Sequence, residues 1–527
     1  MFNIPTVTVA KTTLTGTSSS VTLTYVAPSV AWTPRHLVVR VNGKTDRTGN
    51  SRDEVNVKFN GDTGTNYNYQ ALYGYASSSE AARYSGVAGL NVGWIATDNT
   101  ASTVFGSMET LVPDALSTRS HKSTVSFVGA AEDGVVVSGG RWASTAAITS
   151  VTMSPVNGTN FNAGSTFELC VVDESFNIDE QILGSAGTFT VSSIGASNGD
   201  LVCIGNMRSA ASVYNDVVDI AINGDSTTSN YACQIIDGTG TTVQAALVAR
   251  PDFGLVSGDS SASGSFGGFI GQITNFADGS NDRAWNSLVN SHGSSSVGSL
   301  RVNSGRWNNT SAITSILLDS NNGSNLLAGS MLSTYAVPKN LIARQENTGS
   351  AGITFSDIPQ TYDHLEVSCY VRDARTAGSD SLLITLNDDT TAANYDRQAL
   401  YASGTGITAN QSAASNNIGN IPDANHTANA FGATTVTIYN YTKTDRHKHI
   451  LSVSGEDAFN YVGIHSLRWE NTAAVTKLLI NGGNGDLVSG SVIELRGIHA
   501  DIAPAAGGAS DIAELNGIAP ADIEAVN

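Results

Sequence analysis

Hydrophobic and polar positions alternate with a period of two along most of this chain. Val55, Val57 and Phe59 alternate with polar residues, and the same pattern returns at 218–222 and 382–386. Such alternation places one face of a strand on a core and the other in water, which predicts antiparallel sheets. Helical periodicity is nearly absent before residue 500, so the chain is predicted to be all-β.

Turn signals separate the alternating segments. Asn60-Gly-Asp62, Asn223-Gly-Asp225 and Asn387-Asp-Asp389 each follow one of them. Asn and Gly adopt positive φ at little cost, so each triplet predicts a tight turn. Many short strands with such turns indicate β-sandwiches of a jelly-roll-like type.

Four blocks of sequence recur three times in the same order. The Arg-Trp block lies at Arg141-Trp142, Arg306-Trp307 and Arg468-Trp469, with spacings of 307 − 142 = 165 and 469 − 307 = 162 residues. The other blocks are the Asn-Gly-Asp segment with its following Asn-Tyr, a Phe-Gly pair and a closing Gly-Ser pair. A period of this length exceeds the roughly 20–50 residues of solenoid repeats and suits a whole domain with its own core.

The repeats predict three tandem antiparallel β-sandwich domains at 1–175, 176–338 and 339–500, followed by a linker and apolar docking tail at 501–527. Small residues at 503–510 form the linker, and the tail is expected to be a short helix or extended. Its aliphatic residues are too many for a solvated tail, so we expect it to dock on this chain or on a neighbour. They are Ile512, Leu515, Ile518, Ile523 and Val526.

In this order, the blocks resemble a repeated β-sandwich domain found in structural proteins of tailed bacteriophages, of the decoration or fibre type. The segment from Ile353 to Tyr362, which opens the third repeat, is typical of that family, and the second repeat departs from it at 226–229. The resemblance implies a virion structural protein on the particle exterior, either a head decoration or a fibre-like component. It does not determine whether the protein lies on the head or on the tail of the particle.

The same resemblance implies partners for this protein and a location in the virion. We expect other virion proteins and further copies of this chain as partners, in a homo-oligomer with a trimer favoured. The alternative function is a glycan- or receptor-binding module of a phage tail fibre, with a host surface glycan as partner. A carbohydrate-active enzyme is the third hypothesis, and we expect no enzymatic activity and no cofactor.

Composition narrows the choice of partners. The chain has 527 residues and a net charge of −19, which argues against nucleic acid and anionic membranes. Its start lacks the basic and apolar regions of a secretory signal, and no apolar run is long enough to span a bilayer, so synthesis in the host cytoplasm is expected. The four cysteines lack metal or redox spacing and are predicted to be core thiols.

The Arg-Trp pairs have two interpretations. An exposed Trp could stack on a sugar ring, whereas a buried Trp would anchor the sandwich, with the Arg stacked on it or paired with a carboxylate. Because all three copies lie in an apolar strand context, we favour structural anchors at Arg141, Trp142, Arg306, Trp307, Arg468 and Trp469.

Two further clusters contain metal-binding residue types. Asp62, Asp225 and Asp389 supply oxygen atoms that could seed a calcium site, but Asn, Asp and Gly are also what a hairpin turn needs, and we predict turns without metal. His447-Lys448-His449 carries two imidazoles, yet no third ligand has suitable spacing. We interpret this segment as a solvated basic strand face.

Overall fold

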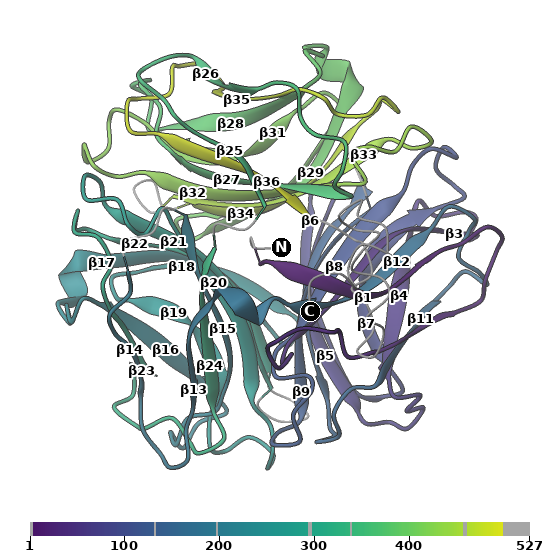
Figure 1. The fold of residues 1–527 in the computed structure, drawn as a ribbon, viewed down its shortest axis with the longest axis vertical. Helices are drawn as coiled ribbons and strands as arrows, with labels where there is room; N and C mark the ends of the chain where they lie inside the picture. Colours follow the sequence, from purple (N-terminus) through teal and green to yellow (C-terminus); the bar gives the residue numbers. More distant parts are fainter. Residues whose placement is uncertain are drawn as a thin grey trace, which may run out of the picture.

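The protein consists of three repeats of twelve β-strands arranged around a common axis (Figure 1). A computed structural model describes residues 4–130, 133–195, 199–292, 298–337, 340–456 and 461–498. These residues contain no α-helix, and 3-10 turns occur at Glu174–Phe176, Thr228–Asn230 and Ala392–Asn394. The prediction of an all-β chain is confirmed for this part of the molecule.

The strands of each repeat follow one another without exchange between repeats. Repeat 1 contains β1 (Thr6–Thr13), β2 (Val21–Thr24), β3 (Leu37–Thr45), β4 (Arg52–Phe59), β5 (Tyr67–Tyr75), β6 (Ser78–Val87), β7 (Leu90–Thr97), β8 (Gly106–Val112), β9 (Lys122–Gly129), β10 (Val135–Trp142), β11 (Ser150–Pro155) and β12 (Thr166–Val172). Repeat 2 contains β13 (Asn177–Ile182), β14 (Phe189–Val191), β15 (Asp200–Met207), β16 (Asn215–Ile222), β17 (Tyr231–Thr239), β18 (Thr242–Val248), β19 (Asp252–Ser257), β20 (Gly267–Thr274), β21 (Arg283–His292), β22 (Gly298–Trp307), β23 (Ile316–Ser320) and β24 (Met331–Val337). Repeat 3 contains β25 (Leu341–Glu346), β26 (Gly352–Phe355), β27 (His364–Val371), β28 (Ser379–Leu386), β29 (Tyr395–Ser403), β30 (Gly406–Ser412), β31 (Asn417–Pro422), β32 (Gly432–Tyr439), β33 (Lys448–Glu456), β34 (Tyr461–Trp469), β35 (Leu478–Gly482) and β36 (Val492–Ile498).

Each repeat folds into a large and a small antiparallel sheet. In repeat 2 the large sheet has the order β13-β24-β15-β20-β21-β22-β17-β18 and the small sheet β14-β23-β16-β19, and repeat 3 has the same order. Repeat 1 follows it too, with its two sheets joined by a short parallel pairing of β3 and β7 at Lys44 and Thr45. In each repeat the first strand pairs with the last strand: β1 with β12, β13 with β24, and β25 with β36.

The space between the two sheets of each repeat is a hydrophobic core. Val55, Val57 and Phe59 of β4 point into the core of repeat 1, and the corresponding residues of β16 and β28 do so in repeats 2 and 3. Intervening residues of β4 and β16 are partly exposed. The alternating pattern therefore identified the small-sheet strands and their inward faces correctly.

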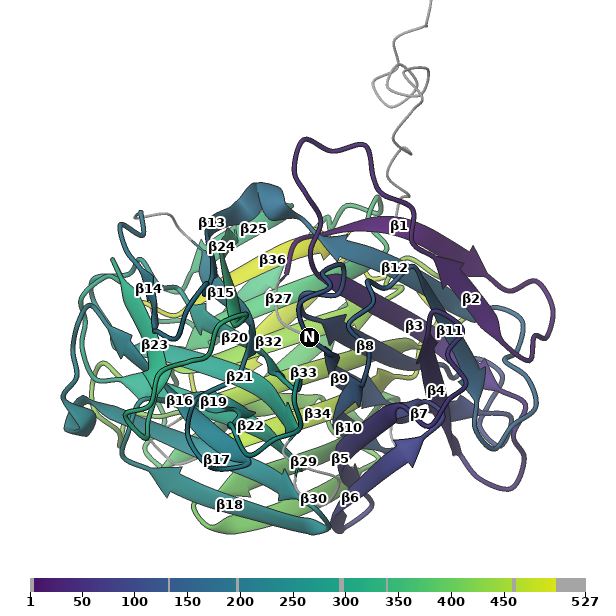
Figure 2. The same cartoon turned by 90° about the horizontal axis from the view of Figure 1, so that it is seen from below.

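A fourth core lies on the axis, where the large sheets of all three repeats meet (Figures 1 and 2). Every residue of β9 is buried, because one face lies in the sandwich and the other on the axis. The axial core contains Val125, Phe127, Val135 and Val137 from repeat 1, Ile270, Leu288, Leu300 and Val302 from repeat 2, and Leu451, Val453, Val462 and Ile464 from repeat 3. This core links the repeats into one structure.

Two further sequence predictions concern the cysteines and the tail. Cys170, Cys203, Cys233 and Cys369 are free and buried, so the prediction of core thiols is confirmed. The predicted docking tail at 501–527 lies outside the described residues.

The axial core predicts how an isolated repeat behaves. A fragment of residues 339–500 keeps its own sandwich core but exposes the axial residues of β33 and β34, and apolar patches of this kind promote association. We expect a β-type circular dichroism spectrum together with self-association in analytical ultracentrifugation. A stable monomeric fragment would show that the axial face is dispensable, and an unfolded one that the sandwich core is insufficient.

Candidate functional site

The Arg-Trp block and the Asn-Gly-Asp block meet in each repeat. The indole Nε1 of Trp142 donates a hydrogen bond to Asp62 Oδ2 at 2.7 Å. Trp307 donates to Asp225 and Trp469 to Asp389 in the same way, both at 2.8 Å. Two motifs about eighty residues apart therefore form one local structure, which is repeated three times.

Each of these carboxylates is surrounded by N–H donors. Asp225 also accepts hydrogen bonds from the side chain of Asn230 at 2.8 Å and from the backbone of Thr227 at 2.9 Å. Burial raises the pKa of Asp225, but the hydrogen bonds from Trp307 and Asn230 outweigh it and lower the pKa to about 2. These N–H donors compensate the charge of the carboxylate.

The tryptophans are buried, with 1–3% of their surface exposed. A sugar ring cannot stack on an indole face that packs inside a sandwich. The neighbouring arginines make polar contacts. Arg306 pairs with Asp282 at 2.8 Å, Arg468 pairs with Asp396 and Glu470, and Arg141 donates to the Ser265 hydroxyl of repeat 2.

The Asn at the start of each turn joins two strands. Asn60 has a φ of 53°, its Oδ1 accepts from the backbone of Thr149 and Ser150, and its Nδ2 donates to Ala147 O. Asn223 and Asn387 make the equivalent bonds. These residues therefore serve the turn that the sequence predicted.

A buried cation lies opposite each Trp in the large sheet, which the sequence interpretation missed. Lys122 pairs with Trp142, Arg283 with Trp307, and Lys448 with Trp469. The side chains of all three cations are fully buried and donate to backbone carbonyl groups, as Lys448 does to Lys443, Arg446 and Thr472. Burial lowers the pKa of Lys448 to about 8.

The interpretation of 447–449 as a solvated basic face is thus wrong. Lys448 and His449 are buried because β33 is a central strand with both faces covered. A signal was available in the sequence. A basic residue stands sixteen positions after the Gly of each Phe-Gly block (122 − 106, 283 − 267 and 448 − 432).

Contacts between repeats also recur, and they close a ring. The residue before each buried cation donates its backbone N–H to a carbonyl group of the next repeat. The pairs are His121 N with Gly264 O at 3.0 Å, Asp282 N with Asn429 O at 3.0 Å, and His447 N with Thr103 O at 2.9 Å. The third pair returns from repeat 3 to repeat 1, so the arrangement has a closed pseudo-threefold symmetry.

A second ring of hydrogen bonds lies at the hairpins after β5, β17 and β29. Buried glutamine amides donate to the hairpin carbonyl of the next repeat: Gln70 to Gly240 at 2.8 Å, Gln234 to Gly404 at 2.8 Å, and Gln398 to Ala76 at 3.3 Å. Because the three glutamine side chains are buried, losing one of these bonds would leave a buried amide without this partner.

At one contact in each junction, the pair of facing residues is not the same in all three junctions. A Cβ on Gly139 would lie 2.2 Å from Asn290, a Cβ on Gly129 2.3 Å from Ser466, and a Cβ on Gly455 2.0 Å from Ser304. In each junction a glycine of one repeat thus faces a larger side chain of the other. Asn290 fills this space and donates to Thr124 O and Gly140 O of repeat 1.

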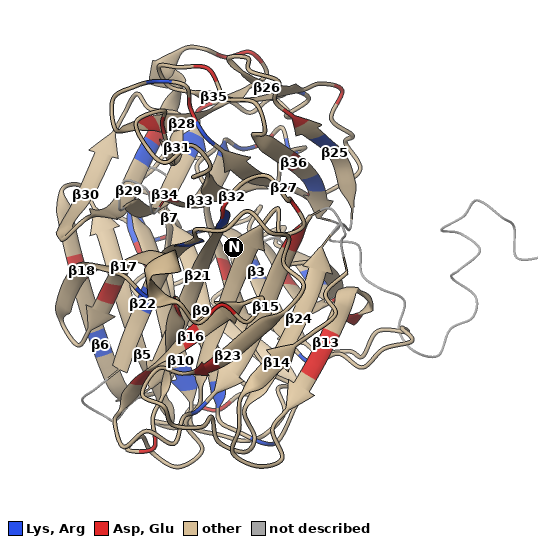
Figure 3. Ribbon diagram, turned by 90° about the vertical axis from the view of Figure 1, so that its left-hand side faces the viewer, with Lys and Arg blue, Asp and Glu red and all other residues tan. Residues whose placement is uncertain are grey.

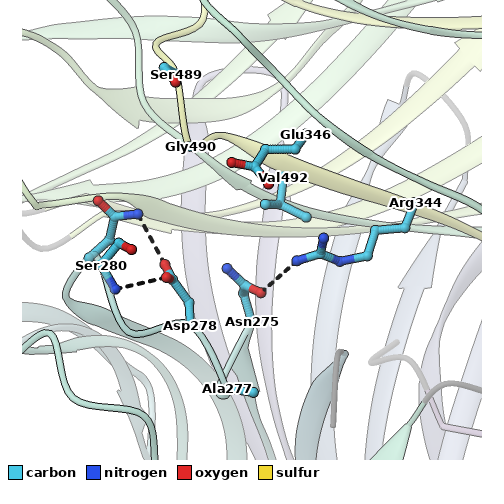
Figure 4. A pocket seen from close by; sticks show the side chains of 10 residues that line it. Asn275, Ala277, Asp278, Ser280, Arg344, Glu346, Ser489, Gly490 and Val492 are labelled. Atoms are coloured by element: carbon cyan, nitrogen blue, oxygen red, sulfur yellow. Dashed lines mark hydrogen bonds between the residues drawn. The ribbon is translucent and has the colours of Figure 1, made fainter. Parts of the chain in front are cut away.

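A polar pocket of about 470 Å³ lies between repeats 2 and 3 (Figure 4). Two of its charged groups, Asp278 and Arg344, already have partners within the chain. Asp278 accepts from Ser280 and Asn281, and Arg344 donates to Asn275 and to Glu494, which lies outside the pocket. We assign no ligand to this pocket, because its polar groups serve the junction.

A second concavity, of about 280 Å³, occurs on repeat 1 and is called the repeat 1 groove. It is lined by Asn56, Lys58, Tyr69, Tyr84 and Asn91, with the 87–89 turn at one side. Tyr84 stacks on Tyr69 with ring centroids 4.8 Å apart and is 46% exposed. No sequence pattern indicated this groove, because its residues come from separate strands.

The described part of the chain contains no group of three or more His, Cys, Asp or Glu side chains that could hold a metal ion. It also contains no helix with the length and apolar character needed to cross a bilayer.

Comparisons with known proteins do not assign a family. No family model matches the chain, and no curated protein matches it. Among solved structures, domains LG4-5 of mouse laminin alpha1 chain share 11% identity over 63% of this chain and 91% of that one, with a TM-score of 0.14. The sialidase CBM40 of Ruminococcus gnavus, bound to alpha2,3 sialyllactose, shares 14% identity over 31% and 93%, with a TM-score of 0.14. An exo-inulinase from Aspergillus awamori shares 8% identity over 87% and 96%, with a TM-score of 0.22. Scores this low do not establish a common fold.

Removing the indole should destabilise one repeat strongly. Trp469→Ala deletes a buried ring and leaves Asp389 without one of its donors, so we expect a loss of about 3–5 kcal/mol, measured by denaturant titration. Asp389→Asn keeps the volume but turns an amide towards the donors, with an expected loss of about 1–3 kcal/mol. Unchanged stability in both variants would contradict the structural role.

The junction glycines give a second test. Gly139→Ala should destabilise the protein by about 1–3 kcal/mol, because the new methyl group meets Asn290. Asn290→Gly in the same chain should restore part of this loss, which a double-mutant cycle of thermal unfolding measures. Gly279→Ala is the control, since nothing lies within 4 Å of its added Cβ. Additive effects at 139 and 290 would contradict a direct contact.

Proposed function

We propose that this protein is a structural component of the exterior of a tailed-bacteriophage particle, as a head decoration or fibre-like protein. In this role one chain acts as a rigid, trimer-like body that is attached to the particle. The resemblance of its repeated blocks to phage structural proteins motivates the proposal. The observation that carries it is the closed ring of three junctions around a shared core.

The ring suits a structural role because each repeat is held by contacts to both of the other repeats. The central strands of each large sheet have both faces covered, and the repeat 1–3 junction closes the ring with contacts like those of the other two. A chain with three linked repeats also forms the ring without the concentration dependence of a homotrimer.

The surface supports packing against other proteins. Charged residues make up 14% of the chain and are sparse along the strands in Figure 3. Ser, Thr and Asn side chains can be covered by a neighbour at lower cost than unpaired charges.

Attachment and oligomerisation are assigned to the tail in this proposal. Because the axial faces are already covered within one chain, further copies must be held by other surfaces. The aliphatic residues at 512–526 are candidates, since burying each is worth about 1.5–3 kcal/mol. The homo-oligomer, with a trimer favoured, and the virion location belong to the same proposal.

The direct test is to locate the protein on particles. Antibodies raised against the purified chain are applied to intact virions and visualised by electron microscopy. Label on the head or the tail is expected, at regularly spaced positions. Label that is absent from purified particles while the protein is present in the infected cell would overturn the proposal.

A truncation tests the role of the tail. Deleting residues 504–527 removes no described strand, since β36 ends at Ile498, so the protein should stay folded. We expect it to lose attachment to particles lacking the protein, measured by co-sedimentation. The full-length chain with Ile523→Asp and Val526→Asp should bind as weakly, because each change places a charge in an apolar contact. Normal occupancy by the truncated chain would exclude the tail as the anchor.

A further inference from the structure

We propose that the repeat 1 groove binds a saccharide, with Tyr84 as the stacking platform. This inference does not depend on the proposed structural function. It concerns one repeat, and it rests on an exposed aromatic face next to polar groups that have no partners in the described chain.

Two paired strands hold the exposed ring of Tyr84 in place. Tyr69 of β5 lies directly opposite Tyr84 of β6, and the two rings are stacked with an interplanar angle of 25°. Tyr69 is 4% exposed, so Tyr84 rests on a buried ring and presents its other face outwards. An aromatic ring fixed in this way offers apolar contact area at little cost in conformational entropy.

The polar groups of the groove are partly fixed and partly open. Asn91 donates to Glu54 at 3.0 Å and accepts from the Nδ2 of Asn56 at 2.7 Å, which orients the Asn56 amide. Among the described residues, no hydrogen bond is made by Asn56 Oδ1, Lys58 Nζ or the Tyr84 hydroxyl. The groove therefore offers an acceptor, a cationic donor and a hydroxyl around one exposed ring.

The lack of a side chain at Gly89 leaves space for the Asn56 amide. A Cβ on Gly89 would lie 2.3 Å from Asn56 Oδ1, so any larger residue would displace the amide. The groove volume, about 280 Å³, is close to the lower end of the usual range for small-ligand sites, about 300–1,000 Å³. It suits a single ring-sized unit rather than an extended chain.

The other two repeats show that the fold does not require these residues. The ladders place Cys233 opposite Val248 and Arg397 opposite Ser412 where repeat 1 has the two tyrosines. The fold thus forms without a ring pair at this position. This separates the groove from the Trp-Asp pairs, which are present in all three repeats.

A saccharide combines the features that match the groove. A pyranose has an apolar face of C–H groups that can lie on Tyr84, and its hydroxyl groups can both donate and accept at the edge. Asn56 would accept from a hydroxyl group, and Lys58 would donate to a hydroxyl or carboxylate oxygen. A flat apolar ligand would leave these groups without partners, which is unfavourable.

The test uses the complete chain with a fluorescent label on an array of neutral hexose, N-acetylhexosamine and uronic-acid oligosaccharides. We expect binding to at least one of the three classes. Titration calorimetry with the bound oligosaccharide should then show an affinity loss of about tenfold or more in Tyr84→Ala. Tyr84→Phe should retain most of the affinity, because it keeps the ring.

Matched variants separate binding from folding. Leu247→Ala removes another side chain that is 46% exposed, on the corresponding strand β18 of repeat 2, and should leave affinity and melting temperature unchanged. Gly89→Ala should weaken binding through the Asn56 amide without touching Tyr84. Failure to bind any of the three saccharide classes, or equal affinity of Tyr84→Ala and the unchanged protein, would overturn the proposal. A partner that binds the groove as a protein would give the first of these results.

Discussion

The large sheet of each repeat has two faces that avoid water, and this constraint shapes the whole molecule. One face is covered by the small sheet of its own repeat, as in any sandwich. The other carries residues such as Phe127, Leu288 and Val453, which only the neighbouring repeats can cover. Three repeats around an axis cover all three faces at once, and the ring then has no free end.

The junctions combine two kinds of contact. The backbone and glutamine rings are the same at each junction, so they hold any pair of repeats together. The glycine positions differ, because Asn290 requires Gly139 opposite it, whereas Ser304 and Ser466 face Gly455 and Gly129. The common contacts thus provide stability, and the differing ones favour one arrangement of the repeats.

Repetition within the chain also separates structural from specific features. The Trp, Asp, Asn and buried cation recur because every repeat must close the same turn and fill the same corner of the sandwich. The Tyr69-Tyr84 pair occurs in one repeat, and the other two repeats fold with different residues at this position. A single-copy feature with exposed surface is therefore where a binding role is best sought in such a protein.

The sequence by itself determined the all-β class, the three repeats and the inward faces of the small-sheet strands, because these depend on local alternation and on self-similarity. It also placed the turns at Asn60, Asn223 and Asn387, where positive φ is a property of single residues. Only the tertiary structure decided that the central strands of the large sheets are buried on both faces, since the elements that cover a strand such as β33 are known only when distant strands are assembled. For the same reason the Trp469–Asp389 bond and the groove at Tyr84 could not be derived from spacing. Each joins residues from distant segments of the chain, and the contacts that give them a role exist only in the folded protein.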